Sequence, residues 1–388
     1  MNKKFNNAVV FICKAKPHRG GGGLGVAFNF LQGFSDPRIF GSDTDVWFMV
    51  GENLSAPPPP NTSADDFLSC IDPGLKQGAY LNFHQTLSLR RLSKEYQKIV
   101  IVGFSPFYFW PFLCAGLKNL ITVHIEQGKG GRHNELAEER GYFSWREHFV
   151  RWCVGFNFRF PFRVVFPSSG ALNLFTQKNP HLKQQAESKT KIVYNGVATC
   201  EAPPTRVHSG PLKIASVAHH VREKGLDTMI HALHLTSEAG VEWNFINYGQ
   251  KTNLTEELHT LVTDLGISRR VNFAGLKPQA EVREYLETSD VFLHTPVSVV
   301  FDLSLLEAMM HAIPVVTTPL EGNREALGVD YPLYAGTAEE VAERLRWIAD
   351  HREEAHRIGL ALRERALRLF TNEAMVGQYA ALVRSLLG

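Results

Sequence analysis

Short apolar runs alternate with longer amphipathic segments along most of the chain. The short runs are rich in β-branched residues and apolar throughout, which is typical of parallel strands covered by helices on both faces. Ten of them predict strands, at 9–13, 46–50, 98–104, 120–125, 163–169, 213–218, 243–249, 270–275, 290–295 and 314–319. Apolar positions repeating every three or four residues predict helices at 24–34, 226–237, 254–265, 280–288 and about 303–312.

This alternation places the chain in the α/β class, and its length fits two domains. Near residue 200, an Asn195-Gly196 turn signal and a Pro-rich polar stretch precede a new strand. We therefore predict two doubly wound, Rossmann-like domains, 1–200 and 201–370, facing each other across a cleft. Residues 337–387 have a helical pattern, and we predict that 371–388 form a helix packing back towards the first domain. Ligands should bind at the carboxyl ends of the strands.

Composition narrows the classes of function. The chain has 388 residues, 44% of them hydrophobic, and a net charge of +2, which argues against a nucleic-acid partner. Five scattered cysteines without a Cys-x-x-Cys pair indicate reduced thiols in a cytosolic protein. The apolar run 8–13 is too short for a signal peptide, and no run approaches the roughly 20 residues of a membrane-spanning helix.

Four glycines at 20–23 follow the first predicted strand and precede a predicted helix. Glycine lets the backbone approach a ligand closely, and the free N–H groups of a helix start can bind an anion. The stretch lacks the Gly-Lys-Ser/Thr of a Walker loop, and its glycine run satisfies a dinucleotide fingerprint almost automatically. It therefore remains either a phosphate or acceptor loop or a flexible surface loop.

His124 lies at the end of the predicted strand 120–125, at the edge of the sheet where ligands bind, and Glu126, Lys129, Gly130 and Gly131 follow in a loop. A histidine in this position can hydrogen-bond a substrate hydroxyl or relay a proton. The alternative is a histidine satisfied within the protein core.

His219, Arg222 and Lys224 follow the strand 213–218, beside a helix that we predict to begin near Glu223. Positive side chains at the N-terminus of a helix suit a diphosphate. A solvated, charged turn would show the same pattern.

The stretch 299–316 is apolar nearly throughout and holds two acids, Asp302 and Glu307. Asp302 is a good N-cap for the predicted helix, whose Leu303, Leu306 and Met310 share one apolar face. Glu307 lies in the second turn, where its carboxylate gains from the helix dipole and could accept two hydrogen bonds from a sugar diol. The alternative is a buried glutamate bonded to neighbouring side chains.

Four segments, at 193–197, 216–233, 273–296 and 301–327, together resemble retaining glycosyltransferases of the GT-B fold, family 4, also called glycosyl transferases group 1. "VYNGV" matches the interdomain Asn-Gly-Val, and "SVAHHVREKGLDTMIHAL" resembles the phosphate-binding turn. "FAGLKPQAEVREYLETSDVFLHTP" and "FDLSLLEAMMHAIPVVTTPLEGNREAL" match the stretch before the donor site and the second-glutamate motif. The order and separation of the four make the resemblance specific.

The resemblance implies a GT-B fold, with an acceptor-binding first domain and a nucleotide-sugar-binding second domain. It implies that Glu307 holds the ribose hydroxyls of the donor, that Lys224 binds its diphosphate and that His124 contacts the transferred sugar. We expect His124, Lys224 and Glu307 to be catalytic. The expected donor site is His219, Arg222, Lys224, Phe301, Asp302, Leu303 and Glu307, and the acceptor or phosphate loop is Gly22, Gly23 and Glu126. No cofactor and no metal are implied.

The sequence also departs from the family pattern. Val299 stands where the first glutamate of the E-x7-E motif is expected, and Asp302 ends the turn usually written Gly-Phe-Gly. His219 replaces an arginine, and Glu321 replaces the first of two paired glycines. Two hypotheses for Asp302 remain open: it partly replaces the missing carboxylate, or it only caps its helix.

The implied reaction moves a hexosyl or deoxyhexosyl unit from a nucleoside-diphosphate sugar to an acceptor hydroxyl, with retention. We expect a role in bacterial cell-surface polysaccharide or lipopolysaccharide synthesis, with a glycan or lipid-linked acceptor. Alternatives are a non-catalytic relative that binds nucleotide as a partner subunit and, ranked lower, a sugar-nucleotide epimerase.

Aromatic and arginine residues mixed in 141–163 suit the headgroup layer of a bilayer, although an ordinary amphipathic core helix would look similar. The expected location is therefore the cytoplasm, with peripheral binding to the inner membrane face as a hypothesis.

Overall fold

A computed structural model describes residues 6–13, 22–34, 37–40, 43–50, 53–55, 79–104, 118–126, 163–201 and 209–388, together with positions 145, 148 and 152. Several predicted features lie outside these residues: the glycines at 20 and 21, the loop residues 129–131 and most of the aromatic and basic segment 141–163.

The chain divides into two compact units, each described by itself. The first comprises Met1–Gly196 and Asn372–Gly388, and the second comprises Val197–Thr371. The boundaries predicted from the sequence lie between residues 200 and 201 and between residues 370 and 371. The last helix, α16 (Asn372–Leu387), thus belongs to the first unit although it follows the second in the chain.

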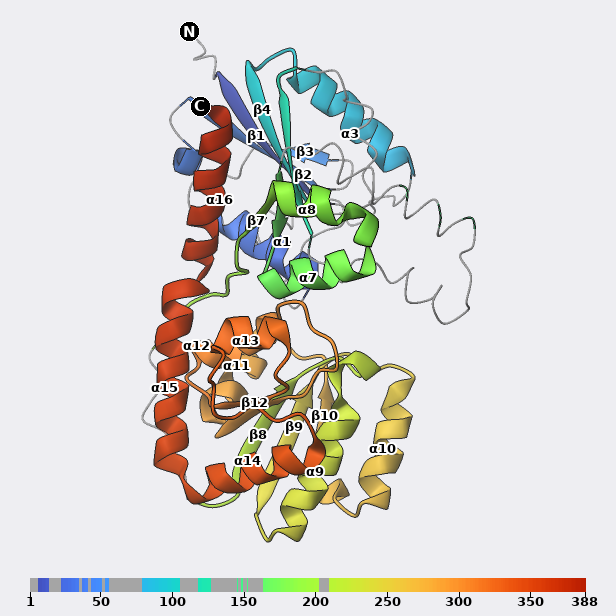
Figure 1. The fold of residues 1–388 in the computed structure, drawn as a ribbon, viewed down its shortest axis with the longest axis vertical. Coiled ribbons are helices and arrows are strands. Elements are labelled where there is room, and N and C mark those ends of the chain that lie inside the picture. Colours follow the sequence, from blue (N-terminus) through green and yellow to red (C-terminus); the bar gives the residue numbers. More distant parts are fainter. Residues whose placement is uncertain are drawn as a thin grey trace. The chain divides into compact units, whose positions relative to one another are not determined.

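Among the described residues, the first unit holds a seven-stranded sheet in the order β3-β2-β1-β4-β5-β6-β7 (Figure 1). All neighbouring strands are parallel except β3, which runs antiparallel to β2 at the edge. The strands are β1 (Asn7–Cys13), β2 (Thr44–Val50), β3 (Asn53–Ser55), β4 (Lys98–Phe104), β5 (Leu120–Ile125), β6 (Arg163–Phe166) and β7 (Thr190–Ile192). The helices are α1 (Gly22–Gly33), η1 (Pro37–Phe40), α3 (Ala79–Leu92), α7 (Ser169–Lys178), η2 (Pro180–Leu182) and α8 (Lys183–Lys189).

Alternate side chains of β1 pack into two separate hydrophobic cores, as expected for a strand that is covered on both faces. On one face Val10 and Ile12 join a buried cluster with Leu89 of α3. On the other face the ring of Phe11 stacks on that of Phe34 just beyond α1, with centroids 4.6 Å apart. Helix α16 covers this second face too, because Tyr379 packs edge-on against Phe30 of α1 at 4.4 Å.

In the second unit, the described residues form a five-stranded parallel sheet in the order β10-β9-β8-β11-β12. Its strands are β8 (Leu212–Val217), β9 (Trp243–Tyr248), β10 (Val271–Gly275), β11 (Val291–His294) and β12 (Val315–Thr317). The helices between them are η3 (Arg222–Lys224), α9 (Leu226–Glu238), α10 (Leu254–Asp264), η4 (Ser268–Arg270), α11 (Gln279–Thr288) and α12 (Leu303–Met310). The chain reverses its direction across the sheet at β11, so right-handed crossovers place helices on both faces.

The predicted helical stretch after 337 forms three helices. After α13 (Glu321–Leu327) come α14 (Ala338–Asp350), α15 (Arg352–Leu369) and α16. The Thr337 side chain caps α14 by accepting a hydrogen bond from the Glu340 N–H, and His351 separates α14 from α15. In the part of the chain that the structure describes, no helix combines the length and apolarity needed to cross a membrane.

All ten predicted strands and all five predicted helices are present, with ends shifted by a few residues. The sheets are parallel, as predicted, apart from the short edge strand β3.

Candidate functional site

The predicted site residues of the second unit lie where three adjacent strands end. β8 leads into the turn that holds Lys224, β11 into the loop before Asp302, and β12 into the turn before Asn323. Strands β8 and β11 are neighbours although β9 and β10 lie between them in sequence. This is the switch point of the sheet, where ligands of open α/β sheets bind.

The turn after β8 is fixed to the loop after β11. Gly225 has a φ of +62°, and a Cβ built on it would lie 2.0 Å from the Thr295 carbonyl oxygen, so only glycine fits. Thr295 Oγ1 donates a hydrogen bond to the Gly225 carbonyl oxygen at 2.8 Å. The predicted start of the helix near Glu223 is therefore wrong, because the left-handed Gly225 separates the 3-10 turn η3 from α9, which begins at Leu226.

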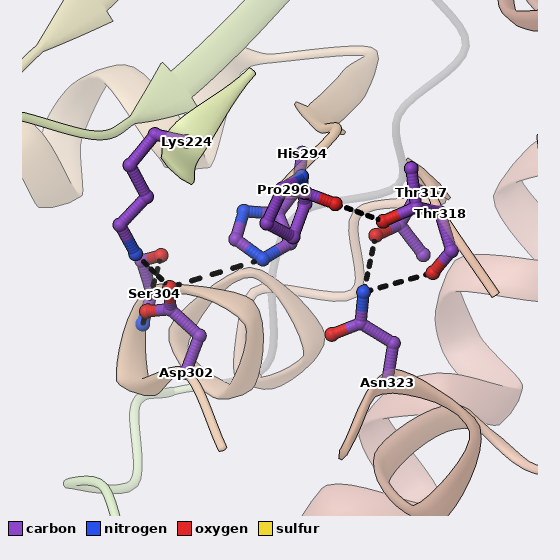
Figure 2. A network of polar contacts seen from close by, with 8 residues as sticks. All are labelled: Lys224, His294, Pro296, Asp302, Ser304, Thr317, Thr318 and Asn323. Atoms are coloured by element: carbon purple, nitrogen blue, oxygen red, sulfur yellow. Dashed lines mark hydrogen bonds and ion pairs between the residues drawn. The ribbon is translucent and has the colours of Figure 1, made fainter. Parts of the chain in front are cut away.

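Lys224 and Asp302, 78 residues apart in the sequence, form an ion pair through Nζ and Oδ2 (Figure 2). Lys224 is one-quarter exposed and the Asp302 side chain only 11% exposed. The other Asp302 oxygen, Oδ1, accepts hydrogen bonds from the Ser304 N–H at 3.2 Å and the Ser304 hydroxyl at 3.0 Å. Asp302 therefore caps α12, as predicted, and also holds the lysine expected to bind phosphate.

These partners keep Asp302 ionised. Burial alone would raise the pKa of Asp302, but the Lys224 ammonium, His294 and the hydrogen bonds from Lys224 and Ser304 together hold it well below 3.8. Both carboxylate oxygens have partners within the protein, which limits their capacity to accept sugar hydroxyls. The geometry thus gives Asp302 a role that neither sequence hypothesis included, the positioning of Lys224.

Glu307 lies further along α12, in the second turn, and has a different environment from Asp302. Burial, with the nearby Asp302 charge, raises its pKa to about 7, although Gln279 and Arg283 act in the opposite direction. Gln279 at the start of α11 donates a hydrogen bond from Nε2 to Glu307 Oε1 at 3.1 Å. Within the described residues this is the one side-chain hydrogen bond to the carboxylate, which leaves Oε2 as an acceptor.

The other two cations predicted near Lys224 contribute less charge than expected. His219 accepts a hydrogen bond at Nδ1 from the Gln250 N–H at 2.9 Å, and partial desolvation of the ring together with the Lys224 charge lowers its pKa below 6.5. His219 therefore carries less positive charge near neutral pH than an ordinary histidine does. Arg222 pairs with Glu257 of α10 at 3.1 Å, with both side chains largely exposed. Of the three predicted cations, Lys224 is the one that pairs with Asp302 at the switch point.

Two further predicted donor residues have buried side chains. Phe301 packs edge-on against Phe370 at 5.5 Å, and Leu303 is 5% exposed in the core. Any contact that they make with a ligand would use their backbone. Gly322 packs closely against the loop before Asp302, because a Cβ on it would lie 2.4 Å from the Val300 carbonyl oxygen.

Sequence analysis missed two residues of this region, His294 and Asn323. The Asn323 amide donates to Thr317 Oγ1 and to the Thr318 carbonyl oxygen, both at 2.9 Å, and so fixes the turn after β12 (Figure 2). His294 is fully buried at the end of β11, with Nε2 3.8 Å from Asp302 Oδ2. Burial lowers its pKa to about 4, so the imidazole is neutral.

The remaining predicted residues belong to the first unit. His124 is the penultimate residue of β5, and its Nε2 lies 3.5 Å from Glu126 Oε2, with both side chains almost fully buried. Gly22 and Gly23 form the first turn of α1. Strands β1 and β5 run parallel, with β4 between them, and His124 lies near the carboxyl edge of this sheet.

Comparison with known proteins finds a match to a family model within the second unit. Residues 201–365 match the model of a family described as "Glycosyl transferases group 1". The chain is 32% identical over 125 residues to the amylovoran biosynthesis glycosyltransferase AmsK of Erwinia amylovora. It is 31% identical over 183 residues to the lipopolysaccharide core biosynthesis glycosyltransferase LpsE of Rhizobium meliloti.

These sequence matches are partial. They cover 30% of this chain and 30% of AmsK, and 44% of this chain and 49% of LpsE. Less than half of each relative is therefore represented in its match.

Similarity to solved structures extends over nearly the whole chain. Anabaena HepE, solved in complex with UDP and glucose, has a TM-score of 0.67 and 17% identity, covering 97% of this chain and 99% of its own. The sucrose-phosphate synthase of Thermosynechococcus elongatus has a TM-score of 0.72 and 15% identity, covering 98% and 99%. The chain therefore has the GT-B fold, with two α/β domains built on parallel sheets.

Proposed function

We propose that this chain is a glycosyltransferase that moves a sugar from a nucleoside-diphosphate sugar to an acceptor hydroxyl. The observation that carries the proposal is the convergence of Lys224, Asp302 and Glu307 at the switch point of the second sheet. These residues lie within the segment that matches the glycosyl transferase family model. The reported complexes of HepE with UDP and with UDP-glucose support a nucleotide sugar as the donor.

In this proposal, Lys224 binds the donor diphosphate. An ammonium group has three N–H donors; Asp302 accepts from one of them in this structure, and rotation of the flexible lysine side chain can turn the ammonium to phosphate oxygens. The N-terminus of α9 begins one residue after Gly225 and adds its free N–H groups. These groups would offset the charge of the leaving diphosphate without a metal ion, so we propose a metal-independent reaction.

Glu307 binds the ribose of the donor. Gln279 fixes one carboxylate oxygen by its hydrogen bond to Oε1, and Oε2 can then accept from a ribose hydroxyl. Because the pKa of Glu307 is about 7, the ionised form that accepts hydrogen bonds best becomes dominant only above neutral pH.

The first unit supplies the acceptor side in this proposal. His124 contacts the transferred sugar, Glu126 orients the histidine, and Gly22 and Gly23 let the backbone approach phosphate or acceptor. As in family 4 retaining enzymes, the acceptor would attack from the face that the diphosphate leaves, and a leaving phosphate oxygen would take its proton. Positioning and charge stabilisation are then the main contributions of the protein.

The names of the relatives support a role in surface glycan synthesis. AmsK and LpsE act in amylovoran and lipopolysaccharide core biosynthesis, so we propose a bacterial polysaccharide or lipopolysaccharide pathway with a glycan or lipid-linked acceptor. The Val299 side chain offers no hydrogen-bond acceptor to the donor sugar, which favours a deoxyhexosyl donor or another hexosyl donor that makes few polar contacts at that edge.

We also propose a cytoplasmic location with peripheral binding to the inner membrane face. Trp145 and Trp152, in the aromatic and basic segment, are 82% and 54% exposed. Flotation with liposomes tests this: wild type should float with anionic but not with neutral lipid, and a Trp145→Ser and Trp152→Ser double variant should not. Equal recovery of both proteins with anionic lipid would contradict membrane binding through these residues.

Two observations favour a second candidate, a non-catalytic nucleotide-binding subunit. Val299 replaces an expected glutamate, and Lys224 is engaged by Asp302. This candidate predicts that a nucleoside diphosphate binds but that its sugar derivatives do not turn over.

Calorimetry with UDP, GDP, dTDP, ADP and CMP separates these possibilities. One nucleoside diphosphate should bind wild type, and Lys224→Met and Glu307→Ala should each weaken its binding at least tenfold. Lys213→Met is the matched control, because Lys213 lies at the opposite end of β8. The matching sugar nucleotides, with lipid-linked acceptors and with EDTA, then test turnover and metal independence. Absence of binding to wild type would refute the proposed function.

A further inference from the structure

His294 is an unusual residue for its place in the fold. It ends β11, whose other residues, Val291, Phe292 and Leu293, are apolar and fully buried. Its own side chain is 0% exposed, and within the described residues neither ring nitrogen has a hydrogen-bond partner. A buried polar group without a partner destabilises a fold, so an apolar side chain would suit this position better for stability alone.

The imidazole is directed at the ion pair already described. Its Nε2 lies 3.8 Å from Asp302 Oδ2, just beyond hydrogen-bond distance (Figure 2). That oxygen is the one that Lys224 contacts, whereas Oδ1 is held by Ser304. Lys224 and His294 therefore approach the same carboxylate oxygen from two sides.

We propose that His294 is a positioning residue that becomes the hydrogen-bond donor to Asp302 when the Lys224 ammonium turns to the donor diphosphate. The inference rests on the proposed function, since it needs an anion that draws Lys224 away. Asp302 is only 11% exposed, so water replaces a lost partner of Oδ2 poorly, and a buried carboxylate oxygen without a donor is costly. A small shift of the His294 ring supplies that donor.

The exchange needs no proton transfer. The neutral imidazole donates its Nε2–H, and the carboxylate stays ionised throughout. Burial keeps the imidazole uncharged above about pH 5, because its pKa is lowered to about 4. A charged imidazolium would compete with Lys224 for Asp302. A neutral imidazole binds the carboxylate more weakly than the ammonium does, so it bonds to Asp302 only after Lys224 has left. His294 thereby lowers the cost of releasing Lys224 to a ligand that His294 itself does not touch.

The first test needs no nucleotide. Lys224→Met removes the ammonium, so His294 should then bond to Asp302. Urea denaturation measures the coupling between His294→Leu and Asp302→Asn, once with Lys224 present and once in the Lys224→Met background. The coupling should change the unfolding equilibrium constant by less than about twofold when Lys224 is present. In the Lys224→Met background it should change that constant by roughly tenfold. Equal coupling in both backgrounds would overturn the inference.

The second test follows binding of UDP, GDP and dTDP by calorimetry, with the corresponding nucleosides as phosphate-free probes. His294→Leu, which keeps a similar volume, should weaken diphosphate binding roughly tenfold and leave nucleoside binding unchanged. His294→Gln, whose amide also offers an N–H, should restore most of the affinity.

Ser216→Ala is the matched control, because Ser216 Oγ on β8 is also buried and has no partner in the described part of the chain. It should leave diphosphate binding unchanged. Unaltered binding in His294→Leu, or an equal loss in Ser216→Ala, would overturn the inference. If wild type binds no nucleoside diphosphate, the proposed function fails, and the urea cycle alone decides whether His294 partners Asp302.

Discussion

Replacing Glu307 by glutamine should stabilise the protein at alkaline pH. The fold raises the pKa of Glu307 from 4.5 to about 7, so the folded state holds this proton more tightly than the unfolded chain does. As pH rises from 4.5 through 7, wild type therefore loses stability that Glu307→Gln, which cannot ionise, retains.

The size of the effect follows from the shift. A displacement of roughly 2.5 pKa units corresponds to about 3 kcal/mol, and the partial exposure of the side chain reduces it somewhat. The advantage of Glu307→Gln over wild type should grow by about 2–3 kcal/mol between pH 5 and pH 8. The nucleotide should show the opposite trend, because its binding to wild type should tighten over the same interval as the carboxylate ionises.

The assay is urea denaturation of both proteins at several pH values between 5 and 8. Glu281→Gln is the matched control, because Glu281 forms an exposed ion pair with Lys277 on the same helix as Gln279. Its stability relative to wild type should change by less than about 0.5 kcal/mol. If the difference in the free energy of unfolding between Glu307→Gln and wild type does not vary with pH, the idea that burial raises the pKa of Glu307 is refuted.

Three further predictions concern the same region. Gly225→Ala should lower the free energy of unfolding by more than about 2 kcal/mol in thermal denaturation, since its Cβ would meet the Thr295 carbonyl oxygen. Gly240→Ala is the control: with φ +79° but open space around its Cβ, it should cost only about 1 kcal/mol. Asp302→Asn should destabilise the protein by about 2 kcal/mol at pH 7, and the gap should close as pH falls below 3.8, because the depressed pKa of Asp302 contributes stability only while the carboxylate is ionised. An equal gap at pH 3 would contradict this assignment. Arg222→Ala should change stability by less than about 1 kcal/mol, since its ion pair is exposed, and a larger loss would show an unrecognised partner.

The fold could be predicted wherever a local pattern encodes it. Continuous apolar, β-branched runs marked the strands of both sheets, and Asp302 marked the start of α12 because a cap acts on its own helix. Strands β3 and β7 were missed because each has only three residues and a mostly polar composition. β3 pairs with the adjacent β2, whereas the pairing of β7 with β6 joins segments separated by α7 and α8, which no local pattern encodes.

The site could be predicted only in part, for the same reason. Lys224, Asp302 and Glu307 follow from the position of strand ends and from motif spacing. The pairing of Lys224 with Asp302, and of Gln279 with Glu307, joins segments 78 and 28 residues apart and needs the tertiary fold. His294 was hidden in an apolar strand, because a missing hydrogen-bond partner leaves no trace in a sequence.

The central claim is that Lys224 and Glu307 bind a nucleoside diphosphate at the switch point of the second sheet. Calorimetry of wild type, Lys224→Met, Glu307→Ala and the control Lys213→Met against the five nucleotides tests it most directly. The account predicts one nucleoside diphosphate that binds wild type and the control equally, and both site variants at least tenfold more weakly. Binding of equal strength in all four proteins, or no binding to wild type, would contradict it.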